Sequence, residues 1–186
     1  GIYNGYKYTE TRYEDVVTNR ANVGNFVYSD VVTYPFGYGL SYSTFEYSNM
    51  KVIRNNENDT YEVSVDVKNT STIDGKEVVQ IYVQKPYTAL DITNGIEKPS
   101  VELVGFVKVD VPAGQTVTAK TTVEEKYFAS YDAKTEKTYV IGSSNTKDEY
   151  LITAAKDAHD AVNNILQYKK SKGVAIEESK MYVNAS

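Results

Sequence analysis

Hydrophobic and polar residues alternate through the middle of the chain, a pattern typical of β-strands with one buried face. From residue 61 to 68, the sequence YEVSVDVK places a tyrosine and three valines on one face and polar residues on the other. A turn rich in Asn, Ser, Asp and Gly follows, and the next stretch places Val79, Ile81 and Val83 on one face until Pro86 ends it. We expect these two strands to pair with each other in antiparallel fashion.

The alternation continues after residue 100. Residues 101–111 predict a long strand, with Gly105 at a position where a bulge would turn Phe106 inward. A tight turn follows, and residues 117–123 then alternate between apolar residues and polar residues rich in threonine. This strand is predicted to pair back on the preceding one as a hairpin.

Three shorter strands complete the pattern, near residues 45–52, 138–141 and 150–154. No long helical period separates the strands, as parallel β-α-β units would require. The sequence therefore predicts an all-β fold, an immunoglobulin-like antiparallel β-sandwich of about seven strands.

Both ends of the chain differ from this pattern. Residues 1–33 begin with a short alternating piece up to Tyr8 and continue without a sustained period, so we expect this N-terminal extension to belong to a neighbouring domain. Residues 156–186 switch to a helical period with Asp157 as the N-cap, and are expected to form a C-terminal helix and a linker. The predicted sandwich occupies residues 34–155.

The composition of the chain excludes several classes of function but does not indicate a particular one. The formal net charge is -5 and no stripe of Lys or Arg occurs, so the chain has no electrostatic footprint for nucleic acid or an anionic membrane. With no cysteine there is no disulfide, no thiolate nucleophile and no Cys-ligated zinc. Eighteen tyrosines beside five phenylalanines favour half-buried strand surfaces. The cellular compartment is left open.

No residue pattern indicates catalysis, a metal or a cofactor. The single histidine, His159, lies between acidic residues that cannot all face one ion on a helix, so we expect a capped and solvated first turn. No Gly-x-Ser-x-Gly and no glycine-rich phosphate loop occurs. Neighbouring acids at Glu14-Asp15, Glu124-Glu125 and Glu177-Glu178 are expected to be solvated, so no catalytic pair is assigned.

The densest aromatic cluster lies between residues 34 and 47 and includes Tyr34, Phe36, Tyr38 and Tyr42. Its rings, separated by glycines, would suit either a platform for sugar rings or a clamp at the entry of a domain. We favour the clamp, because the segment leads directly into the first sandwich strand.

Longer motifs carry a resemblance to a known family. The sequence YPFGYGLSY followed by TFEY, from residue 34 to 47, resembles the junction that introduces the C-terminal fibronectin-III-like domain of glycoside hydrolase family 3 β-glucosidases. The start, GIYNGYKY, is similar to the end of the family's preceding α/β sandwich domain, although Asn4 and Lys7 depart from the usual Val and Arg. GKEVVQIYV, ELVGF and PAGQT follow the same sandwich, so the resemblance covers roughly residues 1–155.

The resemblance implies that this chain is a non-catalytic accessory domain. The family's Asp nucleophile and Glu acid/base lie on other domains, in segments without a counterpart here, so those catalytic domains are the implied intramolecular partners and a β-glucoside would be bound only through the parent enzyme. The helix after residue 156 resembles members of the family with a permuted domain order, in which the catalytic barrel follows. A stand-alone carbohydrate-binding module and a fibronectin-III adhesion or dimerisation module are the alternatives.

The long segment from Lys85 to Pro99 is the candidate for contact with substrate. It is bounded by prolines, and long loops on rigid sandwiches tend to carry contacts. The candidate residues at the rim of the substrate cleft are Tyr87, Asp91, Asn94 and Glu97. A loop that only packs against the neighbouring domain is the alternative.

Overall fold

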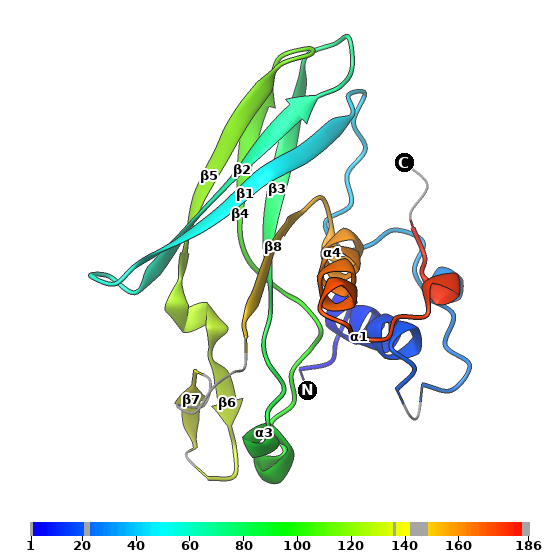
Figure 1. Ribbon diagram of the computed structural model, residues 1–186, viewed down its shortest axis with the longest axis vertical. Coiled ribbons are helices and arrows are strands. Elements are labelled where there is room, and N and C mark those ends of the chain that lie inside the picture. The colour runs from blue at the N-terminus through cyan, green and yellow to red at the C-terminus, as the bar shows by residue number, and fades with distance from the viewer. Residues whose placement is uncertain (1, 21–22, 136, 142–148, 184–186) are drawn as a thin grey trace.

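A computed structural model describes residues 2–20, 23–135, 137–141 and 149–183. It contains two three-stranded antiparallel sheets that face each other, with helices against the outer side of one sheet (Figure 1). The first sheet has the order β1-β2-β5 (Phe45–Asn55, Thr60–Asn69, Thr116–Glu124). The second has the order β4-β3-β8 (Glu102–Val111, Gly75–Gln84, Leu151–Ala155). The predicted all-β sandwich is confirmed.

The remaining elements are short strands and helices. A separate two-stranded sheet pairs β6 (Ser130–Asp132) with β7 (Thr138–Val140), so the predicted strand near residue 138 lies outside the sandwich. The helices are α1 (Tyr6–Val17), α2 (Tyr28–Val31), α3 (Ala89–Asn94) and α4 (Ala158–Ser171), with 3-10 turns η1 (Glu125–Phe128) and η2 (Glu178–Lys180). No helix within the described ranges is long and apolar enough to cross a membrane.

Both predicted strand pairings are wrong, although the strands themselves are present. β2 pairs with β1 and β5, while β3 pairs with β4 and β8, so the connection after β2 crosses from one sheet to the other. β4 and β5 likewise lie in opposite sheets. Alternation determines which face of a strand is buried but not which strand is its neighbour, because a hairpin and a crossover bury the same valines.

Asn69 holds both crossings together. Its side chain is fully buried and its Nδ2 donates to the carbonyl oxygens of Ile73 at 2.8 Å and Val111 at 2.9 Å. Its backbone N–H donates to Gln115 O at 2.9 Å. These bonds join the turn after β2 to the end of β4 and to the turn before β5, so one polar residue stabilises the connections between the sheets.

The bulge near Gly105 is present, but Phe106 is not turned inward. Ile81 pairs with Gly105 and Tyr82 with Leu103, which places the extra residue at Val104. Phe106 lies opposite Gln80, on the outer face of the sheet, and is 66% exposed. The valines at 107 and 109 face the core instead, because side chains alternate strictly again after the bulge.

The predicted alternating piece at the N-terminus is wrong from Tyr6 onward, where α1 begins. The buried residues of α1 are Glu10, Tyr13 and Val17, which have helical spacing. The pattern was obscured because one of the buried positions is a glutamate. A run of seven residues cannot distinguish the two periods by itself.

Two hydrophobic cores result, one on each face of the second sheet. The first lies between the sheets and contains the inner valines of β2 and β3 with Ile81 and Phe45. The second lies between β3 and the helices, and contains Tyr82 and residues of α1, α2 and α4. Because β3 is buried on both faces, the N-terminal and C-terminal segments pack on the sandwich and on each other (Figure 1). The boundaries after residues 33 and 155 stay predictions.

Candidate functional site

The segment between residues 34 and 42 is fastened to the body at two backbone positions. The carbonyl oxygen of Phe36 accepts the N–H of Ala158 at 2.9 Å, and that of Gly37 accepts Nε2 of Gln80 at 2.9 Å. Gly37 has a φ of 86°, and a Cβ built there would lie 2.0 Å from Gln80 Oε1. Only glycine satisfies both conditions, since the left-handed backbone and the close approach each exclude a larger residue.

The side chains of this segment point mostly to solvent. Tyr42 is 97% exposed, and Leu40 and Tyr34 are also largely exposed. The Tyr34 ring stacks on Tyr38 at 5.2 Å, and Phe36 stacks on Tyr6 of α1 at 4.4 Å. We name Tyr34, Phe36, Tyr38, Leu40 and Tyr42 the junction surface. It is a rigidly anchored apolar strip that the described part of the chain does not bury.

The predicted rim residues divide into two internal and two exposed side chains. Asp91 is 3% exposed and forms a capping box with Thr88 at the start of α3. Asn94 is also buried, and its Nδ2 donates to Asp132 Oδ2 of β6 at 2.8 Å. Tyr87 and Glu97 are exposed. Asp91 and Asn94 therefore hold the loop in shape, and only the exposed pair presents polar groups outward.

Buried and half-buried ion pairs anchor the base of this loop. Lys98 Nζ lies 2.6 Å from Asp91 Oδ2, with both side chains at most 6% exposed. Glu102 binds Lys7 of α1 and Lys85 at the end of β3, each at 2.5 Å. Burial by itself would raise the pKa of Glu102, but hydrogen bonds from Lys7 and Lys85 hold that pKa below its usual range.

α1 follows the base of the loop along one of its faces. Beyond Lys7, the hydroxyl of Thr11 accepts the N–H of Ser100 at 2.9 Å. Glu14 accepts Nε2 of Gln84 at 2.9 Å. Positions 7, 11 and 14 share a face of the helix. The N-terminal helix therefore positions the loop of residues 85–99, a link that the sequence pattern did not indicate.

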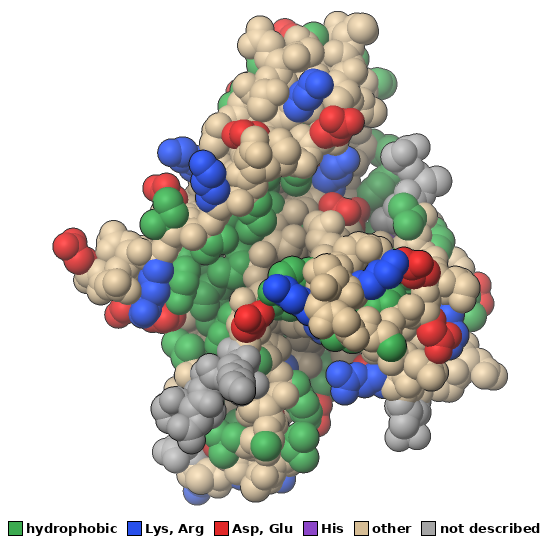
Figure 2. All heavy atoms as spheres, in the orientation of Figure 1, with side chains coloured by type: hydrophobic (Ala, Val, Ile, Leu, Met, Phe, Trp, Pro, Cys, Tyr) green, Lys and Arg blue, Asp and Glu red, His purple; other side chains and the backbone are tan. Residues whose placement is uncertain are grey.

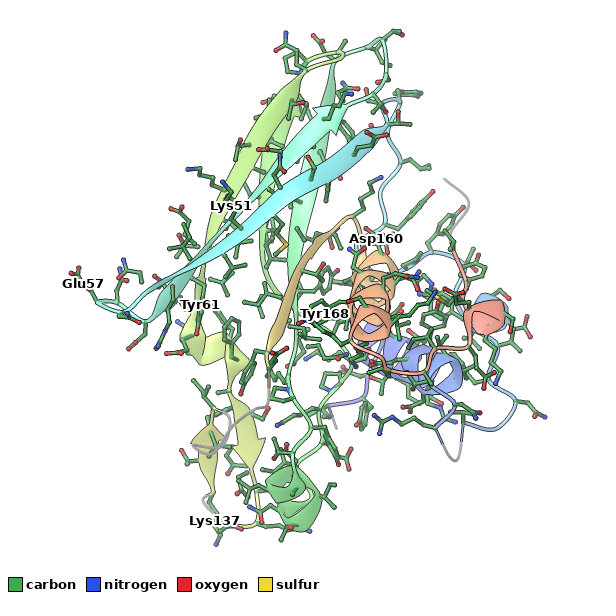
Figure 3. All side chains as sticks on the ribbon, viewed as in Figure 1. Lys51, Glu57, Tyr61, Lys137, Asp160 and Tyr168 are labelled. Atoms are coloured by element: carbon green, nitrogen blue, oxygen red, sulfur yellow. The ribbon has the colours of Figure 1, made fainter. Side chains whose placement is uncertain are left out.

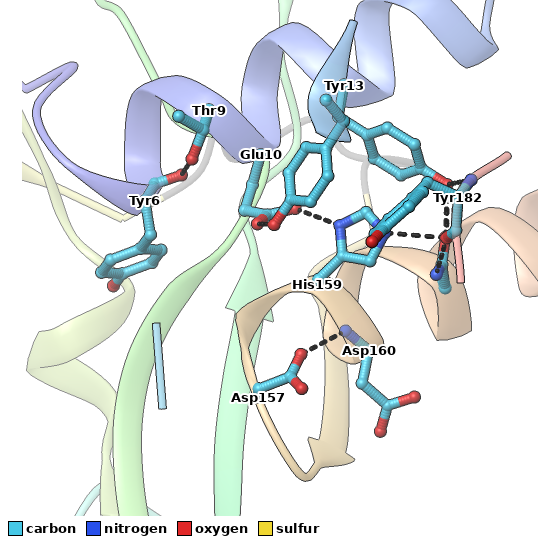
Figure 4. Close-up of polar contacts among 10 residues, drawn as sticks. Tyr6, Thr9, Glu10, Tyr13, Asp157, His159, Asp160 and Tyr182 are labelled. Carbon is cyan, nitrogen blue, oxygen red and sulfur yellow. Dashed lines mark hydrogen bonds and ion pairs between the residues drawn. The ribbon is translucent and has the colours of Figure 1, made fainter. Parts of the chain in front are cut away.

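His159 is buried, so the expected solvated turn is wrong for this residue. Asp157 does cap α4, since its Oδ1 accepts the N–H of Asp160 at 2.8 Å. His159, however, is 1% exposed and binds Glu10 of α1 (Figure 4). The sequence does contain a signal for the burial of His159. Its spacing from Val162 and Leu166 places the three residues on one stripe of the helix.

The acidic neighbours are also not uniformly solvated. Glu14 has a side chain 12% exposed and pairs with Lys169, and Glu125 pairs with Arg54. Glu177 and Glu178 are exposed as expected, at 40% and 57%. The residues that the structure describes include no group of three or more His, Asp and Glu side chains able to hold a metal ion.

Two shallow hollows of about 450 and 380 Å³ adjoin β8 and share Tyr150 and Ile152. Hydrophobic side chains gather on this face between β1 and α4 (Figure 2), and Tyr61 and Tyr168 lie on the two sides of β8 (Figure 3). Among the described lining residues, each hollow has a single carboxylate, Glu149 in one and Glu125 in the other. Glycoside hydrolysis canonically uses two carboxylates that flank the scissile bond, and the described residues of neither hollow provide such a pair.

Comparison with known proteins identifies the class of domain to which this two-sheet fold corresponds. A family model described as "Fibronectin type III-like domain" matches residues 77–144, in agreement with the two-sheet sandwich and its crossing connections. The GH3 β-glucosidase of Bifidobacterium adolescentis superposes with a TM-score of 0.63 and 29% identity, over 86% of this chain and 20% of that enzyme. β-Glucosidase 3B of Thermotoga neapolitana superposes with a TM-score of 0.62 and 28% identity, over 86% of this chain and 18% of that enzyme.

Curated relatives identify the family. The thermostable β-glucosidase B of Acetivibrio thermocellus is 31% identical over 87% of this chain and 18% of that enzyme. An exo-α-(1->6)-L-arabinopyranosidase of Bifidobacterium longum is 32% identical over 89% of this chain and 18% of its own length. The chain thus spans about a fifth of the length of these relatives. It is homologous to the non-catalytic fibronectin type III-like domain of glycoside hydrolase family 3 enzymes, and the resemblance of its motifs to that domain is confirmed.

Proposed function

We propose that this domain buttresses the catalytic domains of a longer β-glucosidase-type enzyme and contributes the loop of residues 85–99 to the rim of its substrate cleft. The observation that carries the proposal is the extent of the match. The alignments with glycosidases include 86–89% of this chain but only 18–20% of the length of each glycosidase. In such enzymes the domain is one part of a larger polypeptide.

The junction surface supports the buttressing role. Tyr42 and Leu40 are 97% and 88% exposed, while the backbone at Phe36 and Gly37 is held firmly by α4 and β3. Exposed aromatic rings on a rigid support are typical of the buried centre of an interface, because little conformational entropy is lost when they are covered. The partner is the catalytic part of the same enzyme.

The loop supports the rim role through its internal order. Its buried polar groups are paired within the loop, with its base or with β6, so Tyr87 and Glu97 are presented from a fixed backbone. The Tyr3 hydroxyl donates to Glu97 Oε2 at 2.7 Å, which links this carboxylate to the N-terminal segment. A tyrosine ring beside a carboxylate can stack on a sugar and accept its hydroxyl hydrogens.

The buttressing role is tested on the longer enzyme encoded by the surrounding gene. We expect Tyr42→Ser with Leu40→Ser to lower the thermal midpoint of the catalytic domains while leaving the melting of the isolated 186-residue chain unchanged. Ile53→Ser is the matched control, because Ile53 is a 59% exposed apolar residue near the end of β1, in the other sheet. Equal melting of the double variant and the control enzyme would refute the docking role.

The rim role is tested by kinetics on the same enzyme. Tyr87→Ala and Glu97→Gln should raise KM for gluco-oligosaccharides several-fold while leaving KM for a small aryl β-glucoside unchanged. Tyr139→Ala is the control, since this ring is 73% exposed on β7. Saturable binding of gluco-oligosaccharides to the isolated chain would instead favour a stand-alone binding module, and hydrolysis by the isolated chain would refute its non-catalytic role.

A further inference from the structure

The start of the chain reaches the loop of residues 85–99 through one tyrosine side chain. The Tyr3 hydroxyl donates to Glu97 Oε2 at 2.7 Å and lies 3.3 Å from the carbonyl oxygen of Lys98. These partners are 94 and 95 positions away in the sequence. Figure 1 shows the N-terminal segment beside the two arms of the chain that lead into and out of α3. A residue outside the loop therefore holds the end of one of its exposed side chains.

The backbone on both sides of Glu97 is fixed by buried neighbours. Ile96 is 3% exposed, and its N–H donates to the carbonyl oxygen of Asp91 at 2.8 Å. Lys98, on the other side, forms the buried ion pair with Asp91. The remaining freedom of Glu97 lies in its side-chain torsions, which an exposed glutamate samples widely. The Tyr3 hydroxyl removes much of this freedom, because it holds one oxygen of the carboxylate.

The contact occupies only part of the carboxylate. Among the described residues, Tyr3 is the hydrogen-bond donor to Glu97, and it uses Oε2. An ionised carboxylate offers about four lone-pair sites, so Oε1 keeps its capacity to accept hydrogen bonds from a ligand. The hydroxyl thus orients the group without blocking it.

Tyr87 belongs to the same cluster of side chains. Burial raises the pKa of the Tyr3 hydroxyl, and the hydrogen bond to Glu97 and the charges of Glu97 and Tyr87 raise it further. Tyr87 is therefore close enough to act on Tyr3. The two rings are 39% and 51% exposed for Tyr3 and Tyr87. Together these residues present aromatic faces beside an oriented acceptor, a combination that suits a neutral sugar ring with its hydroxyl groups.

We infer that Tyr3 is a positioning residue of the rim site. Its hydroxyl fixes the Glu97 carboxylate, so that Oε1 accepts a hydroxyl hydrogen of the sugar unit that lies against Tyr87. The conformational entropy of the glutamate is then lost on folding and not on binding, which strengthens binding without a new contact to the sugar. The rim site extends in this way from the loop to the N-terminal segment. The inference rests on the proposed rim role of Tyr87 and Glu97.

Tyr3→Phe in the longer enzyme is the decisive variant, because it removes the hydroxyl and keeps the ring. Ordering one flexible side chain on binding corresponds to about a two- to tenfold loss of affinity. We expect KM for gluco-oligosaccharides to rise by about this factor while kcat stays the same, since the carboxylate binds the ground state and the transition state alike.

Tyr168→Phe is the matched control. Tyr168 is 40% exposed on α4, and its hydroxyl donates to Glu149 Oε2 at 3.1 Å (Figure 3). The control therefore removes an equivalent bond between an exposed tyrosine and a glutamate, in a different element. It should leave KM for gluco-oligosaccharides unchanged.

A Glu97→Ala background separates positioning from a direct role of Tyr3. With no carboxylate to orient, the addition of Tyr3→Phe should change KM no further. An equal rise in both backgrounds would overturn the inference, because the hydroxyl would then act by itself. A rise for Glu97→Ala with none for Tyr3→Phe would overturn it while the rim role stands. No rise for either variant would overturn the rim role and the inference together.

The contact itself is measured on the isolated 186-residue chain by nuclear magnetic resonance. The carbon resonance of the Glu97 side-chain carboxylate is assigned by its loss in Glu97→Ala. We expect Tyr3→Phe to shift this resonance, because the carboxylate loses a hydrogen bond, and Tyr168→Phe to leave it in place. An identical Glu97 resonance in the wild type and in Tyr3→Phe would overturn the positioning role.

Discussion

The buried ion pair between Asp91 and Lys98 should decide whether the loop of residues 85–99 keeps its shape. Their side chains are 4% and 6% exposed, and Nζ lies 2.6 Å from Oδ2. Asp91→Ala leaves the ammonium group buried with one described acceptor, the carbonyl oxygen of Pro86 at 2.7 Å. Breaking a buried pair typically costs about 3–5 kcal/mol, and the retained acceptor favours the lower end of that range.

The same carboxylate also caps α3. It accepts the backbone N–H of Thr88 at 2.6 Å, and loss of such a cap typically costs about 1 kcal/mol. We therefore expect Asp91→Ala to lower the free energy of unfolding by about 4 kcal/mol in total. Lys98→Met removes the charge, keeps the apolar length and leaves the cap in place, so it should cost less.

A double-mutant cycle measures the pair itself. When both residues are changed, neither buried charge lacks its partner, and the loss should be smaller than the sum of the single losses by about 2 kcal/mol. Urea denaturation followed by circular dichroism gives the three free energies, and hydrogen exchange of residues 88–96 reports the loop directly. A coupling below about 0.5 kcal/mol would refute the reasoning, because the pair would then behave as two independent sites.

Three further changes test other parts of the fold. Gly37→Ala should lower the free energy of unfolding by about 1–3 kcal/mol, because the φ of 86° and the 2.0 Å approach of Gln80 Oε1 both oppose a Cβ. Calorimetry measures this loss. Gly39→Ala is the control and should melt like the wild type, because a Cβ at Gly39 meets nothing within 4 Å. The pKa of Glu102 is lowered, so its stabilisation is present above the unfolded pKa of about 4.3 and is lost as pH falls through the folded value. Glu102→Gln should therefore cost about 3 kcal/mol at pH 7 and less at pH 3 in urea titrations, and an equal loss at both pH values would contradict this account. The pKa of Asp157 is raised, so stability from this group grows as pH falls through the folded value. Asp157→Asn should retain the cap and show no loss at pH 7, whereas Asp157→Ala should cost about 1 kcal/mol in the same assay, and equal losses would refute the capping role.

The chain's local patterns determined the strands, the faces they bury and the C-terminal helix. The valines of residues 63–67 and 79–83 line the first core as their alternation predicts, and Asp157 caps α4. These features depend on the geometry of neighbouring residues, so a short window of sequence contains them. Motifs such as YPFGYGLSY also identified the family, because this continuous stretch of sequence contains the whole segment that leads into the sandwich.

Tertiary structure alone decided the strand partners and the roles of the polar residues. Asn69 binds both connections between the sheets, Glu10 meets His159 across 149 positions, and Asp91 is used to hold its own loop. None of these contacts leaves a local period, since each joins residues that become neighbours only when the sheets and helices pack. A buried glutamate and an exposed one look identical in sequence, and only the partner in space determines which is stable.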